Sequence, residues 1–199
     1  MGARDYASAR AGAGGLVGCV NVDPVWPRIR RVTTTAQAYK EGDWFAVPMA
    51  HGFAAGLVAR RPKRGPIILG YFFGPCRRQL PDVNDLGPIR AEQAALICRV
   101  RDGALHRGLW RVVGHHSHWR RKDWPLPAFH RREGLSGRGI RIEYDGDDLT
   151  TPARQMEASV TDLALPEDVV YDQDRLIDLL TKLLAEKKPV TIDPTHWVR

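Results

Sequence analysis

Three histidines that stand close together are the residues of this sequence best suited to chemistry. His115, His116 and His118 fall within four residues, and on an extended strand His116 and His118 would share a face. Imidazole nitrogens bind zinc, but a zinc site needs further ligands, and Cys98 is the one candidate on a neighbouring predicted strand. A solvated polar loop is the simpler interpretation, so we expect no metal site and no other cofactor.

Basic residues interleaved with aromatic residues follow the histidines. Cations that track phosphates, beside rings that stack on bases, are typical of proteins that bind single-stranded nucleic acids. The alternative is a charged rim whose aromatic rings are turned into the core, and we favour it. The residues concerned are Arg120, Arg121, Lys122, Arg131 and Arg132, with Trp119, Trp124 and Phe129 among them.

Sequence motifs for catalysis are missing. The chain has no phosphate-cradling glycine motif, no nucleophile elbow and no carboxylate pair on a firmly predicted element. Asp145, Asp147 and Asp148 surround Gly146, but a calcium loop of the EF-hand type needs a longer ligand spacing and a distal glutamate. A plain turn is expected there, and we expect the protein not to be an enzyme.

Charge is unevenly distributed along the 199 residues. Residues 1–40 carry a net charge of +4, residues 41–140 carry +9 and residues 141–199 carry −6, which sum to the total of +7. One interpretation is that the acidic C-terminal part packs near the basic middle. The other is that a basic surface binds an acidic partner or a nucleic acid.

Composition narrows the class of protein further. A hydrophobic content of 43% is close to the norm for a globular domain with a real core. The three cysteines are widely spaced, and no pair has CxxC spacing, which indicates a reducing compartment and a cytoplasmic protein. No apolar run reaches the roughly 18 residues of a membrane span, so no membrane association is expected.

A series of β-strands must position these side chains. Runs of branched and aromatic residues, separated by turn residues, predict strands over 43–49, 53–60, 66–73, 96–101, 109–113, 140–144 and 153–160. Residues that face opposite ways alternate over 96–101, which predicts a strand with one solvent-exposed face. Arg99 would lie on that face. Residues 77–91 and 115–123 are predicted to be irregular loops. Residues 124–129 have too many prolines for a central strand, so an extended segment or a sheet edge is predicted there.

One amphipathic helix is predicted over residues 172–187. Asp172 or Asp174 caps its start, its leucines form one apolar stripe that includes Leu180 and Leu183, and Pro189 ends it. The predicted fold is mainly β: a single antiparallel β-barrel, or a strongly bent sheet of six to eight strands, with this helix packed on it. We expect a flexible tail over 1–37, a β-barrel-like domain over 38–165, and a helix and tail over 166–199.

Five of these segments occur in an order that resembles a known protein family. They are residues 42–48 (GDWFAVP), 52–58 (GFAAGLV), 69–73 (LGYFF), 108–114 (GLWRVVG) and 124–129 (WPLPAF). The arrangement resembles the immunity protein 26 family of bacterial polymorphic toxin systems, over residues 39–145. The resemblance implies a mostly β protein, encoded beside a secreted toxin, whose partner is that toxin and which neutralises it by protein–protein contact. A small basic nucleic-acid-binding β-barrel is the alternative function.

A candidate partner-binding site follows from the loops. Contacts of an inhibitor are expected on exposed loops held by a rigid scaffold, and Trp and Arg are enriched at binding hot spots. The loop over residues 115–123 is the first candidate, and the loop over residues 77–91 is the second. The proposed contact residues are His115, His116, His118, Trp119, Arg120 and Arg121.

Overall fold

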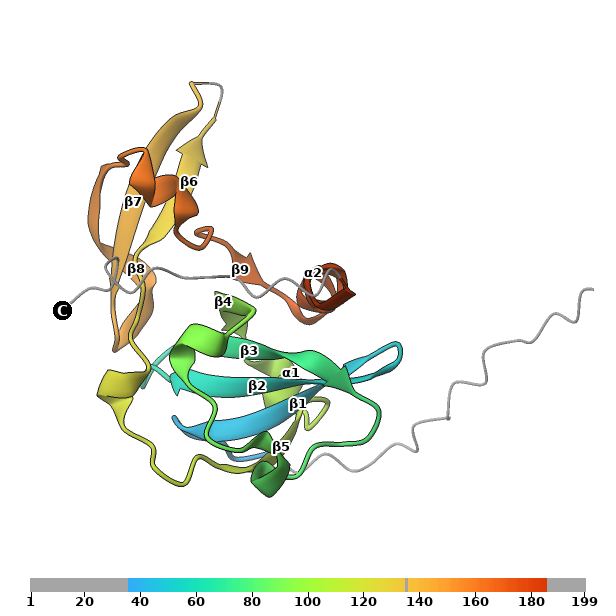
Figure 1. Ribbon diagram of the computed structural model, residues 1–199. Coiled ribbons are helices and arrows are strands. Elements are labelled where there is room, and N and C mark those ends of the chain that lie inside the picture. The colour runs from blue at the N-terminus through green and yellow to red at the C-terminus, as the bar shows by residue number, and fades with distance from the viewer. Residues whose placement is uncertain (1–35, 135, 186–199) are drawn as a thin grey trace, which may run out of the picture. The chain divides into compact units, whose positions relative to one another are not determined.

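A six-stranded sheet forms the centre of the protein (Figure 1). The computed structural model describes residues 36–134 and 136–185. The strand order is β5-β1-β2-β3-β4-β9, and all neighbours are antiparallel except the parallel pair β4–β9. The strands are β1 (Asp43–Met49), β2 (Gly52–Arg60), β3 (Ile67–Arg77), β4 (Leu96–Arg101), β5 (Arg111–His115) and β9 (Val170–Tyr171).

The predicted strands of this sheet are confirmed, with shifted ends. β1 and β4 have the predicted bounds, and β2 begins one residue earlier than predicted. The strand predicted over 66–73 continues to Arg77 as β3, because Phe53 of β2 pairs with Arg77. A short helix, α1 (Gly103–His106), lies where only a turn was predicted.

Three further strands form a second sheet, so a single closed barrel is not confirmed. These strands are β6 (Phe129–Glu133), β7 (Arg138–Asp145) and β8 (Asp148–Glu157), in that order across the sheet. β7 and β8 correspond to predicted strands, whereas β6 was not predicted. The six-stranded sheet is open, with β5 at one edge and β9 at the other.

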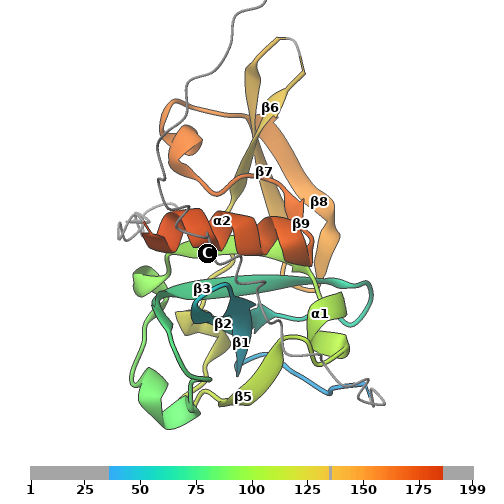
Figure 2. The same ribbon diagram turned by 90° about the vertical axis from the view of Figure 1, so that its right-hand side faces the viewer.

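Both faces of the six-stranded sheet are covered, and adjacent strand residues therefore serve two separate cores. Trp44, Leu57 and Tyr71 face the core that includes Phe129 and Ile142 of the second sheet. Phe45, Val58 and Phe72 face the opposite core, where α2 (Gln173–Ala185) covers the sheet (Figure 2). Phe45 therefore lies under the C-terminal helix, whereas Trp44 lies on the other face of the sheet.

The leucine stripe attaches α2 to the sheet. Asp172 caps the helix, since its Oδ1 accepts a hydrogen bond of 2.9 Å from the backbone N–H of Arg175. Leu176 and Leu180 are completely buried, whereas Leu183 is only half-buried. The predicted end of the helix at Pro189 lies outside the described residues, and no described helix has the length and hydropathy of a membrane span.

The predicted tail over 1–37 falls largely outside the described residues. Gln37, at its end, is held by the fold. Its Nε2 donates hydrogen bonds to the carbonyl oxygens of Leu105 and Trp110, at 3.1 and 2.9 Å. Its Oε1 accepts a hydrogen bond of 3.2 Å from the backbone N–H of Val112. Gln37 thereby ties the start of the described chain to β5 and to the end of α1.

The prediction that one face of β4 is exposed to solvent is wrong, because the second sheet covers that face. Arg99 is only 4% exposed and forms an ion pair of 2.5 Å with Asp168. Its guanidinium also donates a hydrogen bond of 2.8 Å to the carbonyl of Leu149 and lies 4.1 Å from the ring centroid of Tyr144. The Tyr144 hydroxyl donates a 2.8 Å hydrogen bond to Asp168. This network joins β4 to β7 and β8 of the other sheet.

Several ion pairs join the basic middle of the chain to its acidic C-terminal part. They support the first interpretation of the uneven charge, in which the acidic part packs near the basic middle. The pairs among the described residues are Arg99–Asp168, Arg131–Asp168, Arg121–Asp147 and Arg138–Glu157.

Candidate partner-binding cleft

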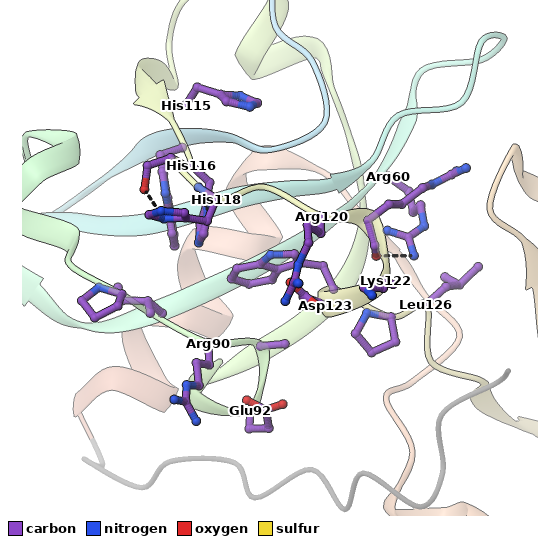
Figure 3. Close-up of a pocket in the computed structure, with 18 of the residues that line it drawn as sticks. Arg60, Arg90, Glu92, His115, His116, His118, Arg120, Lys122, Asp123 and Leu126 are labelled. Atoms are coloured by element: carbon purple, nitrogen blue, oxygen red, sulfur yellow. Dashed lines mark hydrogen bonds and ion pairs between the residues drawn. The ribbon is translucent and has the colours of Figure 1, made fainter.

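A cleft of about 1620 Å³ opens between two loops. One wall comes from the β3–β4 loop (residues 78–95), and the other comes from the β5–β6 loop (residues 116–128) with His115 at its start. In the view of Figure 3, the three histidines gather on one side, Arg60 and Lys122 lie on the other, and Arg90 and Glu92 lie below them. The cleft therefore brings together the two loops that the sequence singled out.

The β3–β4 loop is fixed by its own short turns. Asp82 caps a 3-10 turn over Val83–Leu86, and its Oδ1 accepts a 2.9 Å hydrogen bond from the backbone N–H of Asn84. Leu86 is buried beneath this turn, and Val83 packs against Gly114. A side chain at Gly114 would place its Cβ 2.7 Å from that of Val83, so the close contact between loop and strand requires glycine.

The histidines are held by hydrogen bonds and by stacking. His115 Nδ1 lies 2.8 Å from Oδ1 of Asp43. His116 stacks on Trp44, with ring centroids 6.0 Å apart, and its Nδ1 accepts a 3.2 Å hydrogen bond from the backbone N–H of His118. Burial lowers the pKa of His116, and the nearby imidazoles of His118 and His115 lower it further. These contacts favour a neutral His116 at neutral pH.

A zinc site that combines these histidines with Cys98 does not fit the fold. Cys98 is buried in the core under α2, on the opposite face of the sheet from Trp44 and His116. Within residues 36–134 and 136–185, no group of three or more His, Cys, Asp and Glu side chains is arranged to hold a metal ion.

Trp119 differs from the other proposed contact residues. His115, His116, His118, Arg120 and Arg121 line the cleft, but Trp119 does not. It is half-buried and stacks on Trp124, with ring centroids 5.9 Å apart. Its ring also packs against Gly42, where an added Cβ would lie 2.7 Å away. Trp119 therefore supports the wall of the cleft from behind.

The aromatic rings offer little surface for stacking bases. Trp124 is only 2% exposed and Phe129 is completely buried. Trp119 already stacks on Trp124 with one of its faces. The interpretation that these rings are turned into the core is therefore confirmed, most clearly for Trp124 and Phe129.

Two of the basic side chains in the β5–β6 loop already have carboxylate partners. Arg120 Nε lies 2.6 Å from Oδ2 of Asp123. Arg121 pairs with Glu41 at 3.3 Å and with Asp147 at 2.9 Å, and it is the Arg121 guanidinium that lowers the pKa of Asp147. Lys122 forms no ion pair within the part of the chain that the structure describes. The acidic turn over residues 145–148 thus forms an ion pair with an arginine, which is compatible with the plain turn predicted there.

Arg60 also lines the cleft, although the sequence did not predict it there. Its position beside Arg61, Lys63 and Arg64 indicates an exposed, charged hairpin tip, but Arg60 is only 7% exposed. The register of β2 explains this burial: Val58 pairs with Gly70 and Arg60 with Leu69, so Ala59 is an extra residue in a β-bulge. The bulge turns Arg60 onto the face of Leu69, which is the face of the cleft.

The lining of the cleft carries more positive than negative charge. Its cations are Arg60, Arg90, Arg120, Arg121 and Lys122, and its carboxylates are Glu92 and Asp123. Apolar lining comes from side chains such as Ile89, Pro125 and Leu126. A concave site with an apolar surface and a few convergent polar groups is the usual form of a binding site.

The chain matches the profile of a protein family described as immunity protein 26, over residues 40–139. The chain belongs to this family. The match confirms the resemblance found in the sequence and covers every residue that lines the cleft except Tyr144 and Gly146. Comparisons of this immunity protein 26 family member with curated proteins and with solved structures gave no match.

Proposed function

We propose that this protein is a non-enzymatic immunity protein that binds and neutralises a toxin encoded beside it. The observation that carries the proposal is the cleft, which lies almost entirely within the segment matched to the family. An inhibitor needs a shaped surface with a few anchoring residues, and it needs no chemistry of its own.

The toxin contacts the walls of this cleft. His115, His118 and Arg120 are exposed on its rim. The buried Trp124 holds the β5–β6 loop, and the buried Leu86 holds the β3–β4 loop on the other side. Rigid loops lose little conformational freedom on binding, which favours affinity. His116 contributes from deeper in the wall, and Trp119 keeps the β5–β6 loop in place.

A nucleic-acid partner is the less favoured alternative. The charges of Arg120 and Arg121 are balanced by Asp123, Glu41 and Asp147, which weakens their attraction for phosphates. The rings of Trp124 and Phe129 are buried, so they do not form a stacking platform.

Coexpression with the product of the adjacent reading frame tests the proposal. We expect that product to arrest the growth of bacterial cells, and the immunity protein to restore it. The variant Arg120→Glu places a negative charge on the rim of the cleft and is expected to reduce protection. Lys182→Glu, on the exposed side of α2, is the matched control and is expected to protect like the parent.

Two outcomes contradict the proposal. Failure of the parent chain to restore growth or to bind the purified toxin would exclude a neutralising role against that toxin. Protection without binding would exclude inhibition by contact. Melting curves of both variants, followed by circular dichroism, show whether a loss of protection reflects loss of the fold.

A further inference from the structure

Arg60 is a buried cation without a carboxylate partner among the described residues. Only 7% of its surface is exposed, and that surface faces the cleft. A buried charge is unfavourable unless an opposite charge compensates it. Burial and the nearby guanidinium of Arg121 both lower the pKa of Arg60, which reflects this cost. The guanidinium nevertheless stays charged, because arginine is not deprotonated in proteins.

Backbone carbonyls hold Arg60 in place without neutralising it. Its Nη1 donates a 2.6 Å hydrogen bond to the carbonyl of Ala59, and its Nη2 donates a 3.4 Å hydrogen bond to that of Arg121. These bonds occupy two of the five N–H donors of a guanidinium. The remaining donors have no hydrogen-bond partner among the described residues and are free to meet a group that enters the cleft.

Two carboxylates that act on Arg60 from a distance are paired with Arg121 instead. Glu41 and Asp147 both raise the pKa of Arg60 from a distance, but their ion pairs, at 3.3 and 2.9 Å, are with Arg121. Gly146 lets the two guanidinium groups pack against the turn, because an added Cβ would lie 3.0 Å from Arg121 Nη2 and 3.3 Å from Arg60 Nε. The fold thus positions Arg60 firmly but leaves it without an ion pair among the described residues.

We propose that Arg60 receives an acidic side chain of the toxin. This inference rests on the proposed function, because it names the anchor within the same cleft. A planar guanidinium binds a carboxylate through two parallel hydrogen bonds, and a desolvated site strengthens such a pair. Lys122, which lines the same cleft and has no ion pair within the described residues, adds further positive potential.

A protein carboxylate fits this site better than the phosphates of a nucleic acid. A nucleic acid needs a track of unpaired cations, and two of the five cations that line the cleft, Arg120 and Arg121, are already paired. Arg60 is one enclosed cation that shares its cleft with the apolar Pro125 and Leu126. An enclosed arginine beside apolar surface is typical of a hot spot in a protein–protein interface.

Two substitutions of Arg60 in the full chain test the inference against the purified product of the adjacent reading frame. Arg60→Met removes the charge, and Arg60→Lys keeps the charge but removes the planar fork. Arg60→Met is expected to raise the Kd, measured by calorimetry, roughly 30-fold or more, as for the loss of one partner in a buried charge pair. Arg60→Lys keeps the charge and is expected to raise the Kd by a smaller factor. The matched control, Arg64→Met, removes an exposed charge from the adjacent hairpin and should bind like the parent.

Melting temperature supplies a readout that distinguishes an anchor from a structural residue. Replacing an uncompensated buried charge with an apolar side chain is neutral or stabilising. Arg60→Met should therefore melt at the parent's temperature or above it while it binds more weakly. If Arg60→Met did not fold, the Kd of Arg60→Lys alone would test the inference.

The outcomes separate this inference from the proposed function. If the parent binds the toxin and both Arg60 variants bind equally well, the carboxylate site is wrong and the proposed function stands. If the parent does not bind the toxin, the proposed function fails, and the inference fails with it. Binding of a single-stranded DNA oligonucleotide that is lost on Arg60→Met would overturn the inference in favour of a phosphate ligand. Conversely, one Asp→Asn or Glu→Gln change in the toxin should weaken binding to the parent but not to Arg60→Met.

Discussion

His116 is a titratable side chain whose protonation the fold opposes. Burial lowers its pKa below the ordinary value of 6.5, so the unfolded chain binds a proton more readily than the folded chain. The free energy of unfolding therefore rises with pH where only the unfolded state is protonated, and it falls as the pH drops below about 6.5.

The variant His116→Phe tests this linkage, because it keeps a ring against Trp44 and does not titrate. We expect the melting temperature of the parent to fall more than that of the variant between about pH 7.5 and pH 5.5. His115 and His118 are present in both proteins, so the comparison differs only at position 116. Equal pH dependence in the two proteins would show that His116 is not the responsible group.

Trp119 is expected to contribute to stability. Trp119→Ala removes the stack on Trp124 and uncovers part of the core, which should lower the free energy of unfolding by about 1–3 kcal/mol. His118→Ala, at an exposed position of the same loop, should change it by less than about 0.5 kcal/mol. Denaturant titrations of the two variants check this, and an unchanged midpoint for Trp119→Ala would disprove the supporting role.

The residues of the cleft differ in how far the sequence could predict them. The histidines and Arg120 were predicted as contact residues because polar loops between strands are common positions for binding residues. Arg60 could not be found by alternation, which assigns it to the face of Val58 and the helix. Only the bulge at Ala59, which depends on pairing with β3, turns it toward the cleft.

At the scale of elements, α2 should be essential to the fold. Leu180→Ala removes a completely buried side chain from the core under the helix, and a loss of about 2–5 kcal/mol is expected. Leu183→Ala, at a half-buried position, should have a smaller effect. Equal and negligible losses in thermal melts would mean that α2 is detached from the sheet in solution.

The Arg99–Asp168 pair should be essential for joining the two sheets. Asp168→Ala leaves Arg99 buried without its partner, and we expect a loss of about 3–5 kcal/mol in the free energy of unfolding. Glu157→Ala removes the exposed pair with Arg138, and a loss of at most about 1 kcal/mol is expected. Chemical denaturation distinguishes these values, and similar small losses for both would refute the role of the buried pair.

The strands were largely predictable, but their division into two sheets was not. Runs of apolar residues between turns identified β1 to β5, β7 and β8, because local pattern decides whether a segment is a strand. Prolines in 124–129 obscured the start of β6 at Phe129. Which strands pair depends on contacts between distant segments, such as β4 with β9, and the barrel prediction was not confirmed for that reason.

At the scale of the whole molecule, charge has two separate roles. Ion pairs such as Arg121–Asp147 and Arg138–Glu157 join the basic middle of the chain to its acidic C-terminal part. Other cations, including Arg60 and Arg90, line the cleft without ion pairs among the described residues. The sequence showed the imbalance of charge but not which cations are paired, because pairing depends on the tertiary fold.

Hydrogen–deuterium exchange of the full chain, with and without the purified product of the adjacent reading frame, tests the cleft most directly. We predict that the toxin slows amide exchange in residues 83–92 and 115–126, which form the two walls of the cleft. Amide exchange in α2 should stay unchanged. Slower exchange confined to α2 or to β6, β7 and β8, with no change in the walls of the cleft, would contradict the proposed binding site.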